Sequence, residues 1–218
     1  MTDQKFYTLL YFGDSITWGM TDRQGGWPKR CSEKMRFEIA GRADLAVMDY
    51  ALGIPGNATP DLLIRFEDEL KSRQMMGWHT ICLFAIGMND CQYMIDQDKC
   101  RTSHEDFLRH IQKLVDLAHQ NDVSDICFIG LNPVDEKRTL PMPGFQNLGF
   151  RNEDIAAKNS ILRQFCADRE ITFVDIWEDW QNADLTQLLD DGLHPNDTGH
   201  ERMYHQIYDL ILKPKFQA

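Results

Sequence analysis

The sequence predicts an α/β protein: an open, doubly wound sandwich in which helices cover both faces of a five-stranded parallel sheet. Three observations lead to this prediction. Five short runs are apolar with little alternation, which is typical of parallel strands buried on both faces. The segments between them have the apolar spacing of amphipathic helices. Strand and helix alternate along the chain, so crossovers should be right-handed and ligands should bind beyond the carboxyl ends of the strands.

Five runs rich in aromatic and β-branched residues are expected to form the strands. In chain order they are residues 7–12 (YTLLYF), 45–50 (LAVMDY), 81–86 (ICLFAI), 126–130 (ICFIG) and 171–176 (ITFVDI). Four amphipathic stretches are expected to form helices. They are residues 59–70, 102–118, 152–169 and 198–212.

Cap signals mark where three of these helices should begin. Thr59 is expected to cap the first of them, with Pro60 at the first helical position. Thr102 and Thr198 each stand three residues before a glutamate, a spacing that predicts a capping box at the second and the last helix.

The whole chain, residues 1–218, is expected to form one domain. Its length and its hydrophobic content of 43% suffice for a single core. The one long irregular stretch, residues 131–150, contains three prolines and two glycines. Loops of this length in compact domains are usually functional or mobile.

Charge and composition exclude several classes of partner. With 23 lysines and arginines against 34 aspartates and glutamates, the net charge of -11 repels nucleic acid and anionic lipid surfaces. No stretch approaches the ~20 consecutive apolar residues that span a bilayer, and the N-terminal sequence lacks the features of a signal peptide. The six cysteines form no CxxC pair, so we expect reduced thiols and a cytoplasmic location.

Four polar, glycine-containing blocks are expected at one edge of the sheet. Three follow the first three strands and the fourth precedes the last helix: GDSITWG (13–19), ALGIPGNATP (51–60), GMND (87–90) and DGLHPND (191–197). Because the carboxyl ends of parallel strands share an edge, the side chains of these blocks should lie close together.

The blocks contain the groups that acyl transfer needs. A serine hydroxyl is a poor nucleophile unless a base lies within hydrogen-bond reach and a third group orients that base. His194 can be the base for Ser15, and Asp191 can orient it across a turn that contains a glycine. The candidate donors to an oxyanion are the main-chain N–H groups of Ser15 and Gly56 and the side-chain amide of Asn89.

In this order and over most of the chain, the four blocks resemble those of the SGNH, or GDSL, hydrolase superfamily. The resemblance implies Ser15 as nucleophile, His194 as base and Asp191 as its partner. It also implies an oxyanion hole formed by Ser15, Gly56 and Asn89. The implied fold is a flavodoxin-like three-layer sandwich, and the family works without a metal or an organic cofactor.

The second block departs from the family pattern. Ala51 stands where an asparagine is frequent, and Pro55 stands where a small polar residue often precedes the glycine. Because proline donates no N–H, Gly56 must supply the main-chain donor of this block.

Other acids near these blocks have competing interpretations. Asp190 and Asp175 are alternatives to Asp191 as the acid partner, but the spacing of three residues to His194 favours Asp191. Asp14 is expected to be structural, accepting main-chain hydrogen bonds that hold the turn before Ser15.

Two further patterns have a functional and a structural interpretation. His200 and His205 suggest a metal site, but five residues on a helix make side chains diverge by about 140°, so no metal is expected. Four aromatic residues are candidates for lining an acyl or alcohol pocket, with core packing as the alternative. They are Trp18, Trp27, Phe145 and Phe150.

We therefore expect a serine esterase that hydrolyses carboxylic esters, with small short-chain acyl esters as its substrates. Lysophospholipids and acyl thioesters are alternative substrates. An acyltransferase could use the same residues with a sugar or alcohol acceptor in place of water. A non-catalytic binding module is the remaining hypothesis, and it would require the placement of the four blocks to be a coincidence.

Overall fold

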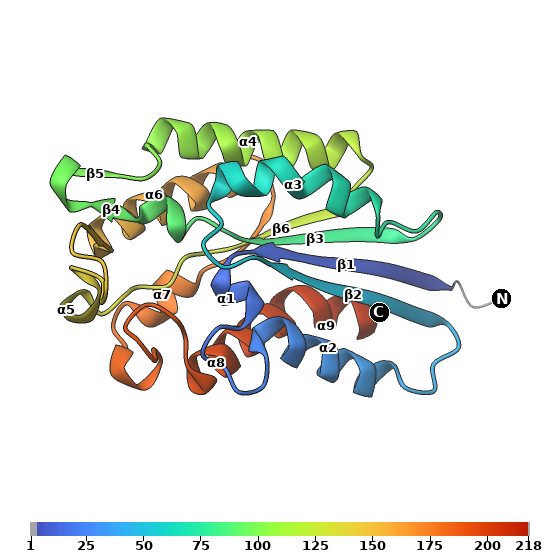
Figure 1. Cartoon of the computed structure of the whole chain (residues 1–218). Helices are drawn as coiled ribbons and strands as arrows, with labels where there is room; N and C mark the ends of the chain where they lie inside the picture. The colour runs from blue at the N-terminus through green and yellow to red at the C-terminus, as the bar shows by residue number, and fades with distance from the viewer. Residues whose placement is uncertain (1–3, 218) are drawn as a thin grey trace.

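A five-stranded parallel sheet forms the middle layer of the computed structural model, which describes residues 4–217 (Figure 1). Its strands lie in the order β2-β1-β3-β6-β8. They span Leu45–Gly53 (β2), Lys5–Gly13 (β1), His79–Ala85 (β3), Asp125–Ile129 (β6) and Thr172–Val174 (β8). The predicted fold class is confirmed, and all five expected strands are present.

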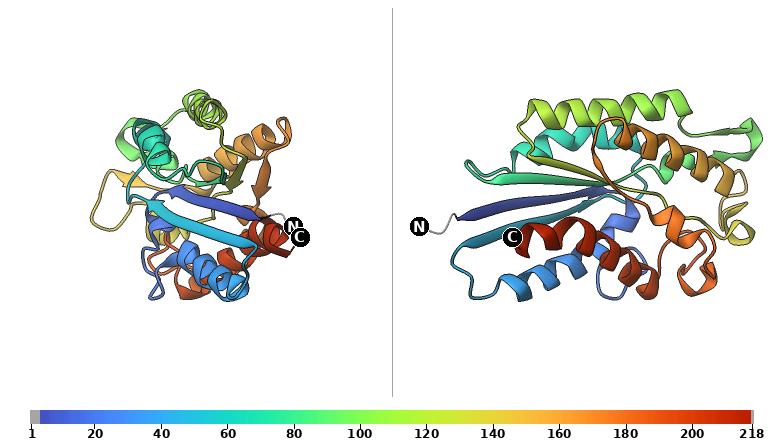
Figure 2. Two further views of the ribbon diagram at one scale, coloured as in Figure 1. Left: turned by 90° about the vertical axis from the view of Figure 1, so that its right-hand side faces the viewer. Right: turned by 180° about the vertical axis from the view of Figure 1, so that it is seen from behind.

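Helices cover both faces of this sheet. On one face lie α3 (Thr59–Lys71), α4 (His104–Gln120) and α6 (Asn152–Ala167), and on the other lie α2 (Gly26–Ile39), α8 (Asp197–Ile207) and α9 (Lys213–Gln217). Figure 2 shows the two helical layers from one end and from behind. A π-helical turn at Tyr208–Leu212 joins α8 to α9. The helix α2 is absent from the predicted set, because its buried residues include Arg30 and Ser32 and its apolar stripe is therefore interrupted.

Short elements gather around the carboxyl ends of the strands (Figure 1). They are α1 (Ser15–Trp18), α5 (Glu136–Thr139), α7 (Ile176–Trp180) and 3₁₀ turns at Asn89–Cys91, Ile95–Gln97 and Leu185–Gln187. A small antiparallel sheet has the order β5-β4-β7, formed by Lys99–Cys100, Tyr93–Met94 and Leu148–Gly149. Residues 131–150 are therefore not irregular throughout, since α5 and β7 lie within them.

The expected caps Thr59, Thr102 and Thr198 are wrong by one or two residues. The residues at the N-caps are Ala58, Ser103 and Asn196. Asn196 displaces Thr198 because its Oδ1 accepts from two free N–H groups at once, those of Thr198 and Gly199, at 3.0 and 3.1 Å. Thr59 is drawn inward instead, where its hydroxyl donates to Asp90 at 2.6 Å.

The register of the sheet brings three strand ends to one level. Gly13, the last residue of β1, pairs with Gly53 of β2 on one side and with Ala85 of β3 on the other. The loops that follow these three strands therefore begin side by side, and they carry the first three polar blocks.

Each face of the sheet has its own apolar core. In β1, Leu9 and Tyr11 belong to the core beneath α2 and α8, whereas Leu10 and Phe12 belong to the core beneath α3 and α4. Phe84 of β3 stacks on Phe12 at 5.6 Å between ring centroids. In the central strands β1, β3 and β6, burial on both faces explains why the sequences lack alternation, whereas the edge strand β2 is mostly only partly buried.

All six cysteines are free thiols, and five of them are buried. Within residues 4–217, no helix combines the length and the apolar character needed to cross a lipid bilayer.

Candidate active site

Ser15 is the first residue of α1, two residues after the end of β1 at Gly13. Asp14 caps this short helix, since its Oδ1 accepts from the Ile16 N–H at 2.9 Å. Gly19 ends the helix with φ at +87°, a conformation that favours glycine. The strand, the cap and the tight end together hold Ser15 at the edge of the sheet, as the strand-end prediction requires.

The structure brings His194 and Asp191 to Ser15, although 179 positions separate the serine from the histidine. Ser15 Oγ lies 2.9 Å from His194 Nε2. His194 Nδ1 lies 2.7 Å from Asp191 Oδ2. The other carboxylate oxygen, Oδ1, accepts from the main-chain N–H groups of Leu193 and His194 at 2.9 and 2.8 Å. Asp191 therefore shapes the turn and orients the ring.

The protonation states of these groups follow from their partners. Burial raises the pKa of the Asp191 carboxyl, but hydrogen bonds from His194 and from the Leu193 N–H outweigh it and hold this pKa well below its usual range. An ionised carboxylate only accepts hydrogen bonds, so Nδ1 of His194 carries the ring proton. Nε2 then has a free lone pair, and it can accept the proton of the Ser15 hydroxyl.

The candidate oxyanion donors stand on the loops after the adjacent strands β1, β2 and β3. Ser15 opens α1, and the first N–H groups of a helix have no acceptor within that helix. Gly56 is exposed, with φ at +80° and open space where a Cβ would stand. Asn89 opens the 3₁₀ turn after β3, and its Nδ2 donates to the Asn57 carbonyl at 3.0 Å. This last bond joins the second and third loops.

Two arginines outside the four blocks bind these loops. Arg65 Nη2 donates to the Gly13 carbonyl at 3.0 Å, and Arg65 Nε donates to Asn57 Oδ1 at 2.9 Å. Arg101 Nη1 donates to the Gly56 carbonyl at 3.0 Å. The loops that carry the candidate donors are thus tied to each other and to the end of β1.

The first part of the 131–150 stretch supports the loop that carries His194. Three of its residues donate to main-chain carbonyls of that loop: Asn132 Nδ2 to Leu193, the Asp135 N–H to Gly192 and Arg138 Nη2 to Asp190, at 3.3, 2.9 and 2.6 Å. Gly192 has φ at +92°, and a Cβ there would lie 2.8 Å from Arg138 Cβ. Only glycine fits this turn without displacing the side chain that supports it.

Sequence reasoning missed these supporting residues. One signal existed for Arg65, which lies three residues after Leu62 and one before Phe66, on the face of α3 that the apolar stripe defines. The structure leaves only 13% of the Arg65 side chain exposed, whereas Ile64 points to solvent. Asn132 and Arg138 gave no signal, because their contacts are with a loop about 55 residues further along the chain.

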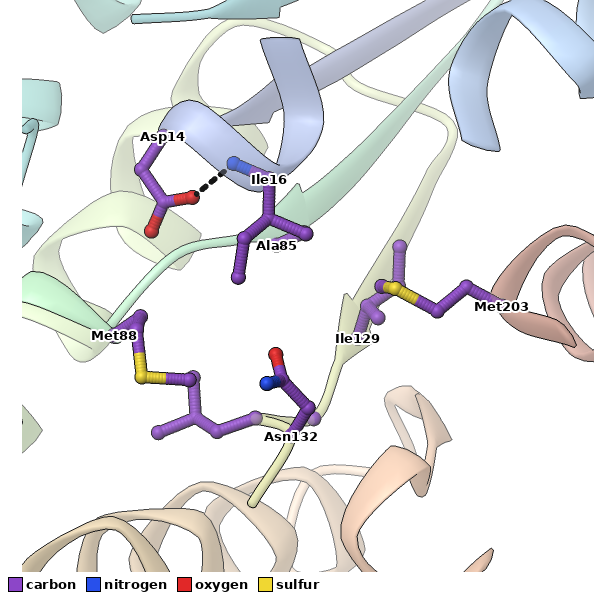
Figure 3. Close-up of a pocket in the computed structure, with 9 residues that line it drawn as sticks. Asp14, Ile16, Ala85, Met88, Ile129, Asn132 and Met203 are labelled. Carbon is purple, nitrogen blue, oxygen red and sulfur yellow. Dashed lines mark hydrogen bonds between the residues drawn. The ribbon is translucent and has the colours of Figure 1, made fainter. Parts of the chain in front are cut away.

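Asp14, the residue before Ser15, is buried, and Figure 3 shows its carboxylate accepting from the Ile16 N–H. It borders a small cavity of about 10 Å³, with Met88 and Asn132 among the other lining residues. Such a space suits about one water molecule. Burial raises the pKa of the Asp14 carboxyl to about 7, although the Ile16 N–H and the nearby His194 act in the opposite direction.

Two of the four aromatic candidates for a substrate pocket are wrong. Trp27 and Phe150 are buried in the core, where Trp27 packs edge-on against Tyr11 at 5.4 Å. Trp18, at the end of α1, is 58% exposed, and Phe145 is 53% exposed. These two remain available to a bound molecule.

The competing acids have other partners. Asp175 caps α7 by accepting from the Glu178 N–H at 3.1 Å, and it forms an ion pair with Arg163. Asp190 meets His194 through the main chain, where its N–H donates to the His194 carbonyl at 2.9 Å. Neither carboxylate takes the position that Asp191 holds beside the imidazole.

The two histidines of α8 do not converge. His200 is buried, with its Nδ1 accepting from the Trp27 N–H at 3.3 Å, whereas His205 is exposed. Burial lowers the pKa of His200 to about 4, so it packs the helix as a neutral group. Among residues 4–217, no group of three or more histidine, cysteine, aspartate or glutamate side chains has the arrangement of a metal site.

Residues 11–202 match the model of the GDSL-like lipase/acylhydrolase family. Among curated proteins, the uncharacterized protein YpmR of Bacillus subtilis (strain 168) is 23% identical over 214 residues, which cover 92% of this chain and 80% of YpmR.

Solved structures with the same fold include esterases. The acetyl xylan esterase AlAXEase has a TM-score of 0.72 and 20% identity, covering 94% of this chain and 100% of that one. A catalytic mutant of Axe2, an acetylxylan esterase from Geobacillus stearothermophilus, has a TM-score of 0.71 and 18% identity, covering 97% of both chains. The lipase/acylhydrolase from Enterococcus faecalis has a TM-score of 0.68 and 21% identity, covering 94% of both.

Proposed function

The chain belongs to the GDSL-like lipase/acylhydrolase family, and on this premise we propose that it is a serine esterase that hydrolyses small acyl esters. Its family is one of carboxylic ester hydrolases. One observation carries the proposal: Ser15 Oγ, the His194 ring and the Asp191 carboxylate are joined by hydrogen bonds of 2.9 and 2.7 Å. Nucleophile, base and orienting acid stand in the relation that acyl transfer needs.

In the acylation step, Ser15 Oγ attacks the ester carbonyl carbon while His194 Nε2 takes the hydroxyl proton. The carbonyl oxygen becomes an oxyanion, which the N–H groups of Ser15 and Gly56 and the amide of Asn89 would stabilise. The imidazolium, held by ionised Asp191, then gives its proton to the departing alcohol. An acyl-Ser15 ester and a free alcohol result.

In the deacylation step, water takes the place of the alcohol. His194 removes a proton from this water as it attacks the acyl carbonyl, and the same donors stabilise the second oxyanion. Return of the proton to Ser15 Oγ releases the carboxylic acid and restores the enzyme. No group besides those named is needed to balance the reaction.

We propose a short acyl group, with acetyl as the first to test. AlAXEase and Axe2, whose fold this chain shares, are described as acetyl xylan esterases. Trp18, at the other end of α1 from Ser15, exposes an apolar side chain that a small acyl or alcohol group could contact. The net charge of -11 disfavours strongly anionic substrates.

Hydrolysis of p-nitrophenyl acetate by purified protein tests the proposal. We expect Ser15→Ala to lower kcat by about 10⁴-fold or more, and Asp191→Asn by about 10³–10⁴-fold through the wrong ring tautomer. A fluorophosphonate probe should label Ser15 in the wild type and leave Ser15→Ala unlabelled.

Ser160→Ala is the matched control, since it removes the hydroxyl of an exposed serine on α6. It should keep the wild-type rate. A Ser15→Ala protein that cleaves the ester as fast as this control would show that the proposed nucleophile is not used. Assays with acetylated xylooligosaccharides and with added alcohol acceptors then separate substrate class and hydrolysis from transfer.

A further inference from the structure

Arg65 joins two loops of the proposed active site. It lies on α3, outside the four polar blocks, and its side chain is 13% exposed. One arm of its guanidinium donates to the carbonyl of Gly13, two residues before Ser15, at 3.0 Å. Its Nε donates to Asn57 Oδ1, one residue after Gly56, at 2.9 Å. A single rigid group therefore spans the distance between the nucleophile and the second loop.

Asn57 extends this connection to the third loop. Its side-chain Oδ1 receives the bond from Arg65, and its main-chain carbonyl receives the Asn89 amide at 3.0 Å. Its N–H donates to the Ile54 carbonyl at 3.1 Å, which closes the loop around Gly56. Each candidate oxyanion donor is thus close to this connection. Ser15 lies two residues after Gly13 and Gly56 one residue before Asn57, both of which accept from Arg65, and Asn89 itself donates to Asn57.

The chemistry of this link requires arginine. The planar guanidinium presents its N–H groups in a fixed fork, so bonds to Gly13 and Asn57 also fix the angle between the two loops. A lysine ammonium is a point charge that could replace one bond but could not hold the angle. Glu69, one turn further along α3, pairs with the remaining arm at 3.2 Å and orients the fork.

We infer that Arg65 is a positioning residue for the oxyanion hole, acting through Gly13 and Asn57 to fix the spacing of the Ser15, Gly56 and Asn89 donors. The inference rests on the proposed function and adds a residue to its machinery. Arg65 itself contacts main chain and side chain of the loops, so its effect on the reaction is indirect. Its loss should displace donors that act on the transition state more than on the bound ester.

Steady-state kinetics with p-nitrophenyl acetate tests this. We expect Arg65→Met to lower kcat by roughly 10–100-fold with KM within about twofold, because a displaced donor loses transition-state stabilisation. Arg65→Lys should recover only part of the loss. Asn57→Ala should lower kcat in the same way, and the double variant should be no slower than Arg65→Met, since Arg65→Met already removes the bond that the two side chains share.

Arg73→Met is the matched control. Arg73 also pairs with Glu69, at 3.1 Å, but its other hydrogen bonds go to the Glu69 carbonyl and to Ser72. We expect it to keep the wild-type kcat. Circular dichroism and thermal unfolding establish that each variant is folded at the assay temperature, and Asn57→Ala carries the test if Arg65→Met does not fold.

The outcomes separate this inference from the proposed function. If the wild type is active and both Arg65→Met and Asn57→Ala match Arg73→Met in kcat, the positioning role is wrong and the esterase stands. A loss confined to KM, or losses that add in the double variant, would also overturn it. A wild type that neither hydrolyses esters nor labels at Ser15 would overturn the proposed function and this inference together.

Discussion

At the scale of single residues, Asp14 couples the proposed active site to pH. Its pKa is raised from 3.8 to about 7 because the carboxyl is buried. Between these values the folded protein holds a proton that the unfolded chain has lost, so stability falls as pH rises from about 4 to 7. The whole change is about 4 kcal/mol, because a tenfold difference in proton affinity corresponds to about 1.36 kcal/mol.

Asp14→Asn should remove this dependence while keeping the oxygen that accepts from Ile16. We therefore expect the free energy of unfolding of the variant, relative to the wild type, to rise by about 4 kcal/mol between pH 4 and pH 7.5. Urea unfolding followed by circular dichroism at several pH values measures it. A difference that stays constant over this range would show that Asp14 is ionised throughout.

Asp197→Asn is a useful comparison because Asp197 changes the free energy of unfolding with pH in the opposite direction to Asp14. Hydrogen bonds from Arg23 lower the pKa of Asp197 to about 2, so the carboxylate stabilises the fold above pH 4 and loses this effect as pH falls toward 2. The deficit of this variant should therefore grow with rising pH, and only in the acidic range below that of Asp14.

At the scale of elements, the start of α8 connects helix stability to the position of His194. Asn196 caps α8 through two N–H groups, and its own N–H and Nδ2 donate to the carbonyls of Leu188 and Gln187 at 2.8 and 3.1 Å. It therefore fixes the chain two residues after His194 as well as the helix.

Asn196→Ala should cost about 1 kcal/mol of unfolding free energy and should also lower kcat several-fold. Ser103→Ala is the matched control, since Ser103 caps α4 through one N–H at 3.0 Å and lies outside the four polar blocks. It should lose similar stability and keep kcat. Urea unfolding and ester hydrolysis of both variants check this. Equal kcat values in the two variants would show that Asn196 stabilises α8 without affecting the position of His194.

The same scale shows where sequence patterns succeed and where they fail. The strands β1 and β3 were predictable because burial on both faces leaves continuous apolar runs in their sequences. The helix α2 was not, because Arg30 enters its buried side to form an ion pair with Asp22 at 2.8 Å. The strand β7 has two residues, and its pairing with β4 depends on chain more than 50 positions away.

At the scale of the whole molecule, the four blocks predicted the contacts of Ser15, His194 and Asp191 because their chemistry and the topology agree. The carboxyl ends of parallel strands lie at one edge of a sheet, so the order of strands and blocks along the chain was enough to predict that the blocks lie close together. The supports were beyond prediction. The hydrogen bonds from Arg65 and Arg138 depend on which side chain reaches across to a loop distant in sequence, and the periodicity of apolar residues in a helix or strand does not indicate such a contact.

The distribution of thiols gives a prediction for the molecule as a whole. Five of the six cysteines are buried and Cys100 is half-buried, and burial raises the pKa of Cys127 and Cys166 to about 12. The thiolate is the reactive form, and burial also raises the pKa of Cys100. Because Cys100 alone is partly exposed, native protein at pH 7.5 should react with Ellman's reagent at Cys100 alone, and Cys100→Ser should abolish that phase. The other five thiols should react only when the whole domain unfolds. In native protein their reaction should therefore be slower than in urea-unfolded protein by roughly 10³-fold or more, the factor that a typical domain stability gives. Rapid reaction of a second thiol in the native state would instead show that part of the sandwich opens without the rest.

The same cysteines give a second measurement. A reductant should leave the Tm unchanged, because none of the six is in a disulfide.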